Sequence, residues 1–210
     1  TNTRVFTPQK IVNEMLDELP EDVWNSKTTF LDPAVKSGVF LVEIFNRLFD
    51  NPELIKEYPD QKERKEHIYK EQLFGVAIDG YDYMISQRNL YRQLRKDSNI
   101  RIIDNYLELV KNKDTRFYTD AIAKEFGQDM KFNVIIGNPP YQKESERGTQ
   151  GAVSIYTNFM QVADAVSTRL SSMIVPARWL SNAGSRGVDM AWVKQQLVSN
   201  EYMEICLLDS

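Results

Sequence analysis

The chain has 210 residues, 42% of them hydrophobic, which is enough to bury the core of one α/β domain. No apolar run approaches the roughly 20 residues of a membrane span, and the N-terminus lacks a signal-peptide pattern, so we expect a cytoplasmic protein without membrane contact. One cysteine (Cys206) and one histidine (His67) exclude a disulfide framework and a cysteine-rich zinc site, and we expect no metal. The net charge of −4 gives no basic excess for holding nucleic acid.

Helices and strands are predicted to alternate along the chain. Apolar spacing and β-rich runs predict, in order, a helix at 9–19, a strand at 28–32, a helix at 38–50, a strand at 72–78, a helix at 81–95, strands at 100–104 and 132–137, a helix at 154–168, a strand at 170–175, a helix at 187–199 and a strand at 202–208. Residues 53–70 are predicted to form a charged, solvated helical excursion interrupted at Pro59, and residues 142–152 a mobile loop. This alternation predicts one α/β domain over residues 1–210, with a mostly parallel twisted sheet covered by helices on both faces.

The strongest local signal is Asn138-Pro139-Pro140-Tyr141, which follows the apolar run FNVIIG directly. Ligands of open α/β sheets bind beyond the carboxyl ends of the strands. Two prolines fix the backbone and remove two N–H donors, so carbonyl oxygens and the Asn138 side chain are available as acceptors for an exocyclic amine. Tyr141 offers a flat face for stacking a planar ring. A plain Asn-Pro turn is the alternative, and the strand before and the tyrosine after favour a functional site.

A second motif, Asp32-Pro33-Ala34-Val35-Lys36-Ser37-Gly38-Val39-Phe40, lies at the first strand-to-helix turn. Nucleotide-like cofactors dock at such turns, and the dipole of the following helix favours a carboxylate. The alternative is an ordinary connection in which Asp32 only caps the helix.

A third motif, Phe6-Thr7-Pro8, precedes the first predicted helix. Thr7 is a candidate N-cap with Pro8 at the first helical position. On its own the motif indicates no more than a capped helix start.

In this order, F-T-P, D-P-A-x-x-S-G-x-F, G-V-x-x-D and N-P-P-Y resemble the N6-adenine DNA methyltransferases of restriction–modification systems, in the gamma arrangement of large single-chain type II enzymes. The segment Pro176-Ala177-Arg178-Trp179-Leu180 is similar to a later motif of that family. The resemblance covers nearly the whole chain and implies a Rossmann-like methyltransferase fold, S-adenosylmethionine as cofactor, and double-stranded DNA as substrate.

The resemblance also implies roles for individual residues. Asn138 and Pro139 would hold the target amine, Pro140 would fix the turn, and Tyr141 would stack on the flipped base. Residues 1–20 would form a helix that closes over the cofactor. The residues implied in cofactor binding are Phe6, Thr7, Pro8, Asp32, Pro33, Ala34, Gly38, Asp79 and Asp104.

The sequence departs from the family pattern at three places. Val35 and Lys36 replace the Cys-Gly of the first turn, where a glycine often serves a positive φ. Ala77 stands where an acid for the ribose hydroxyls is expected, and Asp79 either substitutes for that acid or caps the next helix. The last β-hairpin and the target-recognition region are not visible, so we expect DNA to be held mostly by regions outside this chain, which alone would bind DNA weakly, and a nuclease domain is a candidate companion in the full-length protein.

Two other functions stay open at this point. A methyltransferase acting on protein glutamine or on an RNA guanine also fits N-P-P-Y. A non-catalytic binding module with a decayed cofactor site fits Lys36 and Ala77.

Overall fold

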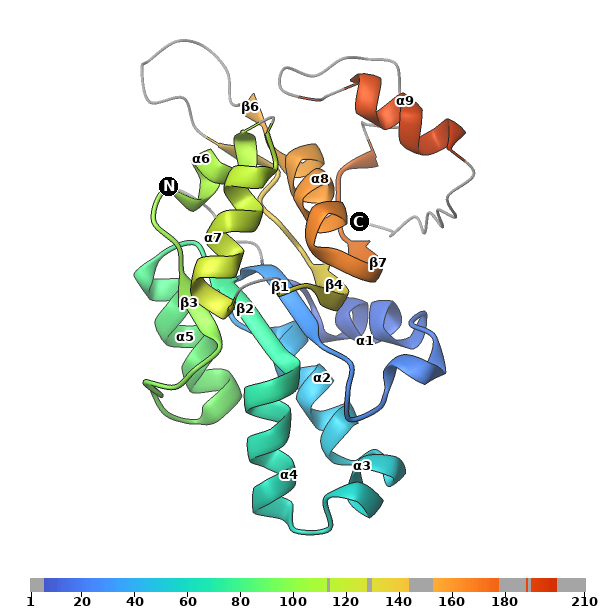
Figure 1. Cartoon of the computed structure of the whole chain (residues 1–210), viewed down its shortest axis with the longest axis vertical. Coiled ribbons are helices and arrows are strands. Elements are labelled where there is room, and N and C mark those ends of the chain that lie inside the picture. Colours follow the sequence, from blue (N-terminus) through green and yellow to red (C-terminus); the bar gives the residue numbers. More distant parts are fainter. Residues whose placement is uncertain are drawn as a thin grey trace.

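The computed structural model describes residues 6–112, 114–127, 130–143, 153–177, 188 and 190–199. Its main sheet runs in the order β3-β2-β1-β4-β7, and every neighbouring pair is parallel (Figure 1). These strands are β1 (Phe30–Val35), β2 (Leu73–Ala77), β3 (Ile100–Ile102), β4 (Phe132–Gly137) and β7 (Ser167–Met173). The predicted parallel α/β fold is confirmed, and the strand expected at 202–208 lies outside the described residues.

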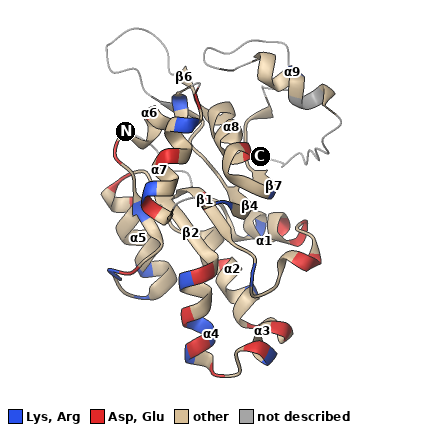
Figure 2. Cartoon of the chain, in the orientation of Figure 1, with Lys and Arg blue, Asp and Glu red and all other residues tan. Residues whose placement is uncertain are grey.

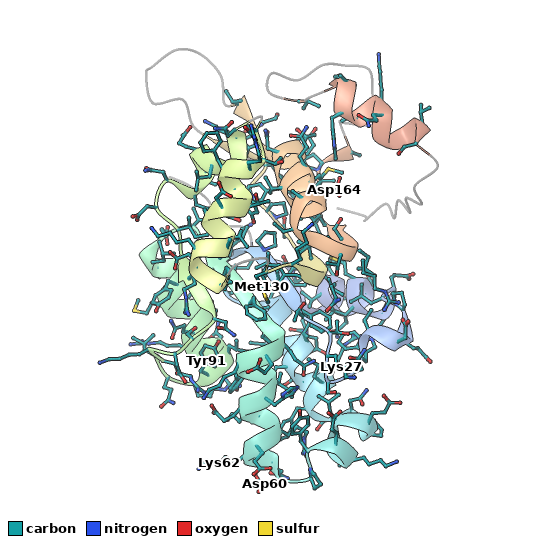
Figure 3. All side chains as sticks on the ribbon, in the orientation of Figure 1. Lys27, Asp60, Lys62, Tyr91, Met130 and Asp164 are labelled. Atoms are coloured by element: carbon teal, nitrogen blue, oxygen red, sulfur yellow. The ribbon has the colours of Figure 1, made fainter. Side chains whose placement is uncertain are left out.

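Alternating side chains of the strands supply two cores, one on each face of the sheet. Val134 and Ile136 of β4 join the core built with α1, α2 and α5, whereas Phe132 and Ile135 join the core built with α6, α7 and α8. A strand buried on both faces is apolar at nearly every position, which explains the run FNVIIG. The helices are α1 (Gln9–Asp17), α2 (Val39–Phe49), α5 (Gly80–Tyr91), α6 (Tyr106–Lys111), α7 (Arg116–Phe126) and α8 (Tyr156–Val166). Figure 3 shows their side chains filling the space against the sheet.

Some element boundaries differ from the sequence prediction. Helix α5 ends at Tyr91 because Arg92 adopts a left-handed conformation with φ 61°. The sequence patterns did not predict α6 and α7. Helix α9 (Met190–Val198) falls within the predicted helix at 187–199. Near the predicted loop at 142–152, β5 (Gln142–Lys143) pairs with β6 (Val153–Ser154), and residues 144–152 lie outside the described part.

The charged excursion consists of α3 (Pro52–Glu57), α4 (Gln61–His67) and a π-helical turn (Ile68–Gln72). Helix α2 runs back from the carboxyl edge of the sheet, so the excursion lies at the amino edge, with Asp60 and Lys62 at its tip (Figure 3). Figure 2 shows charges of both signs along α4. The prediction of a solvated segment was wrong for part of it, because Leu54, Arg64, Ile68 and Tyr69 are buried. Arg64 is buried and donates to the carbonyls of Phe49, Tyr58 and Pro59, and His67 stacks on Tyr58 and hydrogen-bonds the Ser26 carbonyl.

In the described part of the chain, no helix is both long and apolar enough to cross a bilayer.

Candidate active site

A narrow cleft open to solvent lies where the strand order reverses. Strands β2 and β3 follow β1 on one side, and β4 lies on its other side, which is the usual ligand position in an open α/β sheet. The cleft brings all three sequence motifs together. Its lining residues are Phe6, Thr7, Asp32, Ala34, Lys36, Ser37, Gly38, Val39, Phe40 and Asn138.

Asp32 is the buried acid of this cleft. Its Oδ1 atom accepts a hydrogen bond from the Ala34 amide at 3.0 Å, and its side chain packs against Gly137 of the neighbouring strand β4. Burial raises the pKa of Asp32 to about 7, although the Ala34 hydrogen bond and nearby Lys36 oppose the rise. Asp32 therefore changes charge near neutral pH, which is unusual for an aspartate.

The unusual turn keeps the glycine that its geometry needs. Gly38, the N-cap of α2, has φ 77°, and a Cβ there would lie 3.1 Å from the Cβ of Ser86. Among the described residues, only Arg92 and Asn105 combine a side chain with a positive φ, so Lys36 occupies its position without that strain. Lys36, at a position where the resemblance predicts a glycine, therefore needs no left-handed backbone conformation.

Lys36 brings a positive charge into the cleft. Burial lowers its pKa, whereas the carboxylates of Asp32 and Asp82 raise it. Asp82 is a buried residue of α5 and also acts on the pKa of Asp32. Asp32 and Lys36 of the cleft thus interact electrostatically with each other and with Asp82 of α5, which the sequence patterns did not reveal because Asp82 belongs to an otherwise ordinary helix.

Asn138 lies at the carboxyl end of β4 and is 8% exposed. Its Nδ2 atom donates to the Thr7 hydroxyl at 3.2 Å, and its Oδ1 atom is buried without a hydrogen-bond partner among the described residues. The N-cap prediction for Thr7 was wrong, because Pro8 is the N-cap of α1 and no side chain caps that helix. The Thr7 hydroxyl contacts Asn138 instead.

Tyr141 follows on the solvent side of the same turn. Its side chain is 37% exposed, and partial burial raises its pKa. The Tyr141 carbonyl accepts from the Ile155 amide at 3.0 Å, which ties the motif to the start of α8. Pro139 is buried and Pro140 is half-buried. The tyrosine ring is therefore available at the surface next to Asn138, on a fixed backbone.

The remaining predicted site residues do not line the cleft. Asp79 is the N-cap of α5, and its side chain accepts from the Asp82 amide at 2.9 Å. Of the two readings of Asp79, capping is thus the one observed, and a ribose contact stays a prediction. Asp104 is exposed just after β3. Pro8 and Pro33 flank the cleft in sequence.

One supporting residue was missed by the sequence analysis. The hydroxyl of Tyr106 donates to the Pro33 carbonyl at 2.5 Å and lies 3.1 Å from the hydroxyl of Tyr118. Because the Tyr106 hydrogen is used on Pro33, Tyr118 is the donor in the second contact. These two buried hydroxyls support the Asp-Pro-Ala segment of β1 through the Pro33 carbonyl. No local pattern reveals this contact, since the carbonyl is 73 residues away in sequence.

Comparison with known proteins identifies the family to which the chain belongs. The model of the Eco57I restriction-modification methylases matches residues 71–205, which is more than half of the chain. The chain belongs to the Eco57I restriction-modification methylase family. The resemblance predicted from the four motifs is thereby confirmed.

A curated relative of this Eco57I-family chain is an uncharacterized adenine-specific methylase of Mycoplasma pneumoniae. It is 30% identical over 241 aligned positions, which cover 87% of this chain and 57% of the relative. The chain thus spans little more than half the length of that relative.

Solved structures with the same fold also come from restriction–modification enzymes. A modification subunit of a putative type I restriction enzyme from Vibrio vulnificus is 23% identical, with a TM-score of 0.59, over 93% of this chain and 38% of that one. The EcoKI M protein is 16% identical, with a TM-score of 0.61, over 92% of this chain and 38% of that one. At these identities the likeness concerns the fold.

The Eco57I family match includes Asn138–Tyr141 but begins after the first two motifs. The family match therefore does not include Phe6–Pro8 or Asp32. The cleft relates them to the matched segment, because Phe6, Thr7 and Asp32 line it together with Asn138.

Proposed function

We propose that this chain carries the site that transfers a methyl group from S-adenosylmethionine to N6 of an adenine flipped out of double-stranded DNA. The observation that carries the proposal is the buried Oδ1 atom of Asn138, which lies beside the Asp32 cleft and has no hydrogen-bond partner within the described part of the chain. A buried acceptor without a donor costs free energy unless a ligand supplies the hydrogen. An adenine amino group has such hydrogens, and membership in an adenine-methylase-containing family favours it over a glutamine or a guanine.

The cleft suits the charges of the cofactor. The N-terminus of α2 opens onto it at Gly38, where free backbone N–H groups and the helix dipole favour a carboxylate. Asp32 offers an anionic partner for the positive groups of the same molecule when it is ionised. We therefore assign Asp32, Pro33, Ala34 and Gly38 to its methionine end and Phe6, Thr7 and Pro8 to the covering segment. Asp79 and Asp104 are assigned to the ribose and adenine side.

The target base reaches this site only after leaving the duplex stack. Flipping costs a few kcal/mol, and stacking on an aromatic ring recovers about 1–3 kcal/mol. Tyr141, partly exposed beside Asn138, is the residue that we assign to this stacking.

The chain's own residues then align the amine. When bound, the cofactor supplies a methyl group already activated by its sulfonium. Asn138 Oδ1 and the Pro139 carbonyl accept the two N6 hydrogens, so that the N6 lone pair faces the methyl group and the charge developing on N6 is stabilised. Methyl transfer therefore requires the protein to orient the amine and to accept its hydrogen bonds, and the turn at Asn138 provides both.

The DNA contacts of the whole protein are a separate part of the proposal. Type ISP enzyme LlaBIII, a fold neighbour at 18% identity and a TM-score of 0.62, was solved bound to DNA, and this chain covers 15% of it. We propose that regions outside this chain supply most of the DNA affinity, because the chain itself is acidic overall.

The test compares four variants of the full-length protein for transfer of labelled methyl groups to DNA, RNA and protein. Asn138→Ala is expected to reduce N6-methyladenine formation to a small residual rate, Tyr141→Ala to lower it at least tenfold, and Tyr141→Phe, which keeps the ring, to retain it. Asp32→Ala is expected to abolish calorimetric binding of S-adenosylmethionine. Label transferred to RNA or protein but not to DNA adenine would overturn the substrate assignment, and unimpaired transfer by Asn138→Ala would overturn the site.

A further inference from the structure

Thr7 makes an unexpected contact for a residue in its position. Threonine just before a helix usually caps the helix with its hydroxyl, but helix α1 has no side-chain cap here. The Thr7 Oγ1 atom instead accepts a hydrogen bond from Asn138 Nδ2, across 131 positions of sequence. The N-terminal segment thus reaches the side chain on which the proposed function depends.

The structure has the nitrogen end of the Asn138 amide on Thr7 and leaves the oxygen end for the target. The nitrogen end of a carboxamide only donates and the oxygen end only accepts. With Nδ2 on Thr7, the Oδ1 atom remains buried, has no partner among the residues that the structure describes, and is able to accept from an amine. With the amide turned over, N–H groups would meet the N–H groups of the amine, and the acceptor would be lost.

We propose that Thr7 is the positioning residue for Asn138, holding its amide nitrogen while the amide oxygen accepts from the target amine. The proposal rests on the proposed function and adds a role that cofactor contact alone does not give to Thr7. Thr7 also forms part of the wall of the cleft with Phe6. The acceptor for the base is consequently aligned only when the N-terminal segment is in place over the cofactor cleft.

The experiment separates the hydroxyl of Thr7 from its bulk. Thr7→Val keeps the shape and removes the hydroxyl, whereas Thr7→Ser keeps the hydroxyl. In the full-length protein we expect Thr7→Val to lower kcat about tenfold, with KM for S-adenosylmethionine changed less than about twofold, because the lost contact aligns the transition state. Thr7→Ser is expected to retain most of kcat.

Thr157 provides a matched control. It is a buried threonine of α8 whose Oγ1 has no hydrogen-bond partner among the described residues. Thr157→Val is expected to leave kcat unchanged. A thermal melt of each variant shows whether folding is retained.

A double-mutant comparison completes the test. If Thr7 acts through Asn138, Thr7→Val causes no further loss of residual turnover in an Asn138→Ala background. Wild-type kcat in Thr7→Val, an equal loss in Thr7→Ser, or additive losses in the double variant would overturn the role of Thr7. Full activity of Asn138→Ala would instead overturn the proposed function, so the two failures are distinguishable.

Discussion

A methyl group placed on Gly137 would lie 2.7 Å from the Oδ1 atom of Asp32 and 3.3 Å from its Cγ atom. Gly137 is the residue before Asn138, and Asp32 begins the Asp-Pro-Ala segment of the adjacent strand β1. The absent side chain therefore makes room for the buried carboxylate. The segment that begins at Asp32 and the strand that leads into Asn138 are therefore packed against each other, so a substitution in one is expected to displace the other.

Gly137→Ala is expected to displace Asp32 and Pro33, since a 2.7 Å contact is far inside van der Waals distance and the strand cannot move freely. We expect a stability loss of about 1–3 kcal/mol and at least a tenfold weaker affinity for S-adenosylmethionine. Calorimetry and urea denaturation measure the two effects.

Gly80→Ala is the control for this substitution. A Cβ at Gly80, the first residue of α5, meets nothing within 4 Å. It is expected to leave both quantities at wild-type values. Equal cofactor affinity in the two variants would contradict the packing argument.

The raised pKa of Asp32 predicts that cofactor binding depends on pH. Only the ionised carboxylate attracts the positive groups of S-adenosylmethionine, and its pKa is about 7. Affinity is therefore expected to fall by up to tenfold for each pH unit below about 7. Titrations at several pH values between 5 and 8 measure this, and Asp32→Asn is expected to show a flat profile. A flat wild-type profile would rule out Asp32 as the titrating group.

The raised pKa of Asp32 has the opposite effect on folding stability, which is expected to decrease as the pH rises. A carboxyl group whose pKa rises on folding, here from 3.8 to about 7, stabilises the folded state fully below pH 3.8, and this contribution is lost as pH rises toward 7. Asp32→Asn should therefore match the wild type at acidic pH and exceed it above pH 7, by on the order of 4 kcal/mol. Melting curves of both proteins across this range test the sign. A variant that is less stable than wild type at pH 8 would contradict the burial cost.

Much of the fold was predictable from the sequence, because it depends on local apolar patterns. The run FNVIIG is apolar throughout, and a parallel strand buried on both faces requires this. The location of Asn138 and Asp32 at the same cleft was also predictable, since the carboxyl ends of parallel strands share one edge.

The rest depends on contacts between distant residues, which a local pattern does not carry. Thr7 has the sequence of an N-cap, yet its hydroxyl contacts Asn138. His67 lies in a charged run, yet its ring stacks on Tyr58 with the centroids 4.3 Å apart. Helices α6 and α7 were not predicted, and Tyr106 is recognisable as a support for Pro33 only in three dimensions.

Tyr106→Phe tests this support. The variant leaves the Pro33 carbonyl without its donor in a buried position, which costs about 1–3 kcal/mol. Because Pro33 adjoins Asp32, we also expect a severalfold weaker affinity for S-adenosylmethionine. Tyr118→Phe is the matched variant, since it removes the other of the two buried hydroxyls but leaves the Tyr106–Pro33 contact. Denaturation curves and cofactor titrations of both are needed, and an equal loss of affinity in the two would count against a specific role for Tyr106.

The last prediction concerns Arg95, which joins the charged excursion to the end of α5. Its guanidinium donates two hydrogen bonds to Glu66, at 2.8 and 2.7 Å, and lies over the rings of Tyr69 and Tyr91. The Arg95 side chain is only 12% exposed and that of Glu66 is 37% exposed, so the ion pair is partly shielded from water. Arg95→Ala is expected to cost about 2 kcal/mol of stability, and Arg95→Lys to recover only part, because an ammonium cannot make the paired contact.

Arg116 supplies the contrast for Arg95. It also binds a carboxylate, that of Asp114 at 2.6 Å, but its side chain is 84% exposed. Water and salt screen such a pair, so Arg116→Ala is expected to leave the melting temperature unchanged. If burial and the tyrosine rings explain the strength of Arg95, raising the salt concentration should leave the difference between the Arg95→Ala and wild-type melting temperatures largely intact. A difference that disappears at 1 M salt, as expected for a surface ion pair, would show that Arg95 acts only through screened charge.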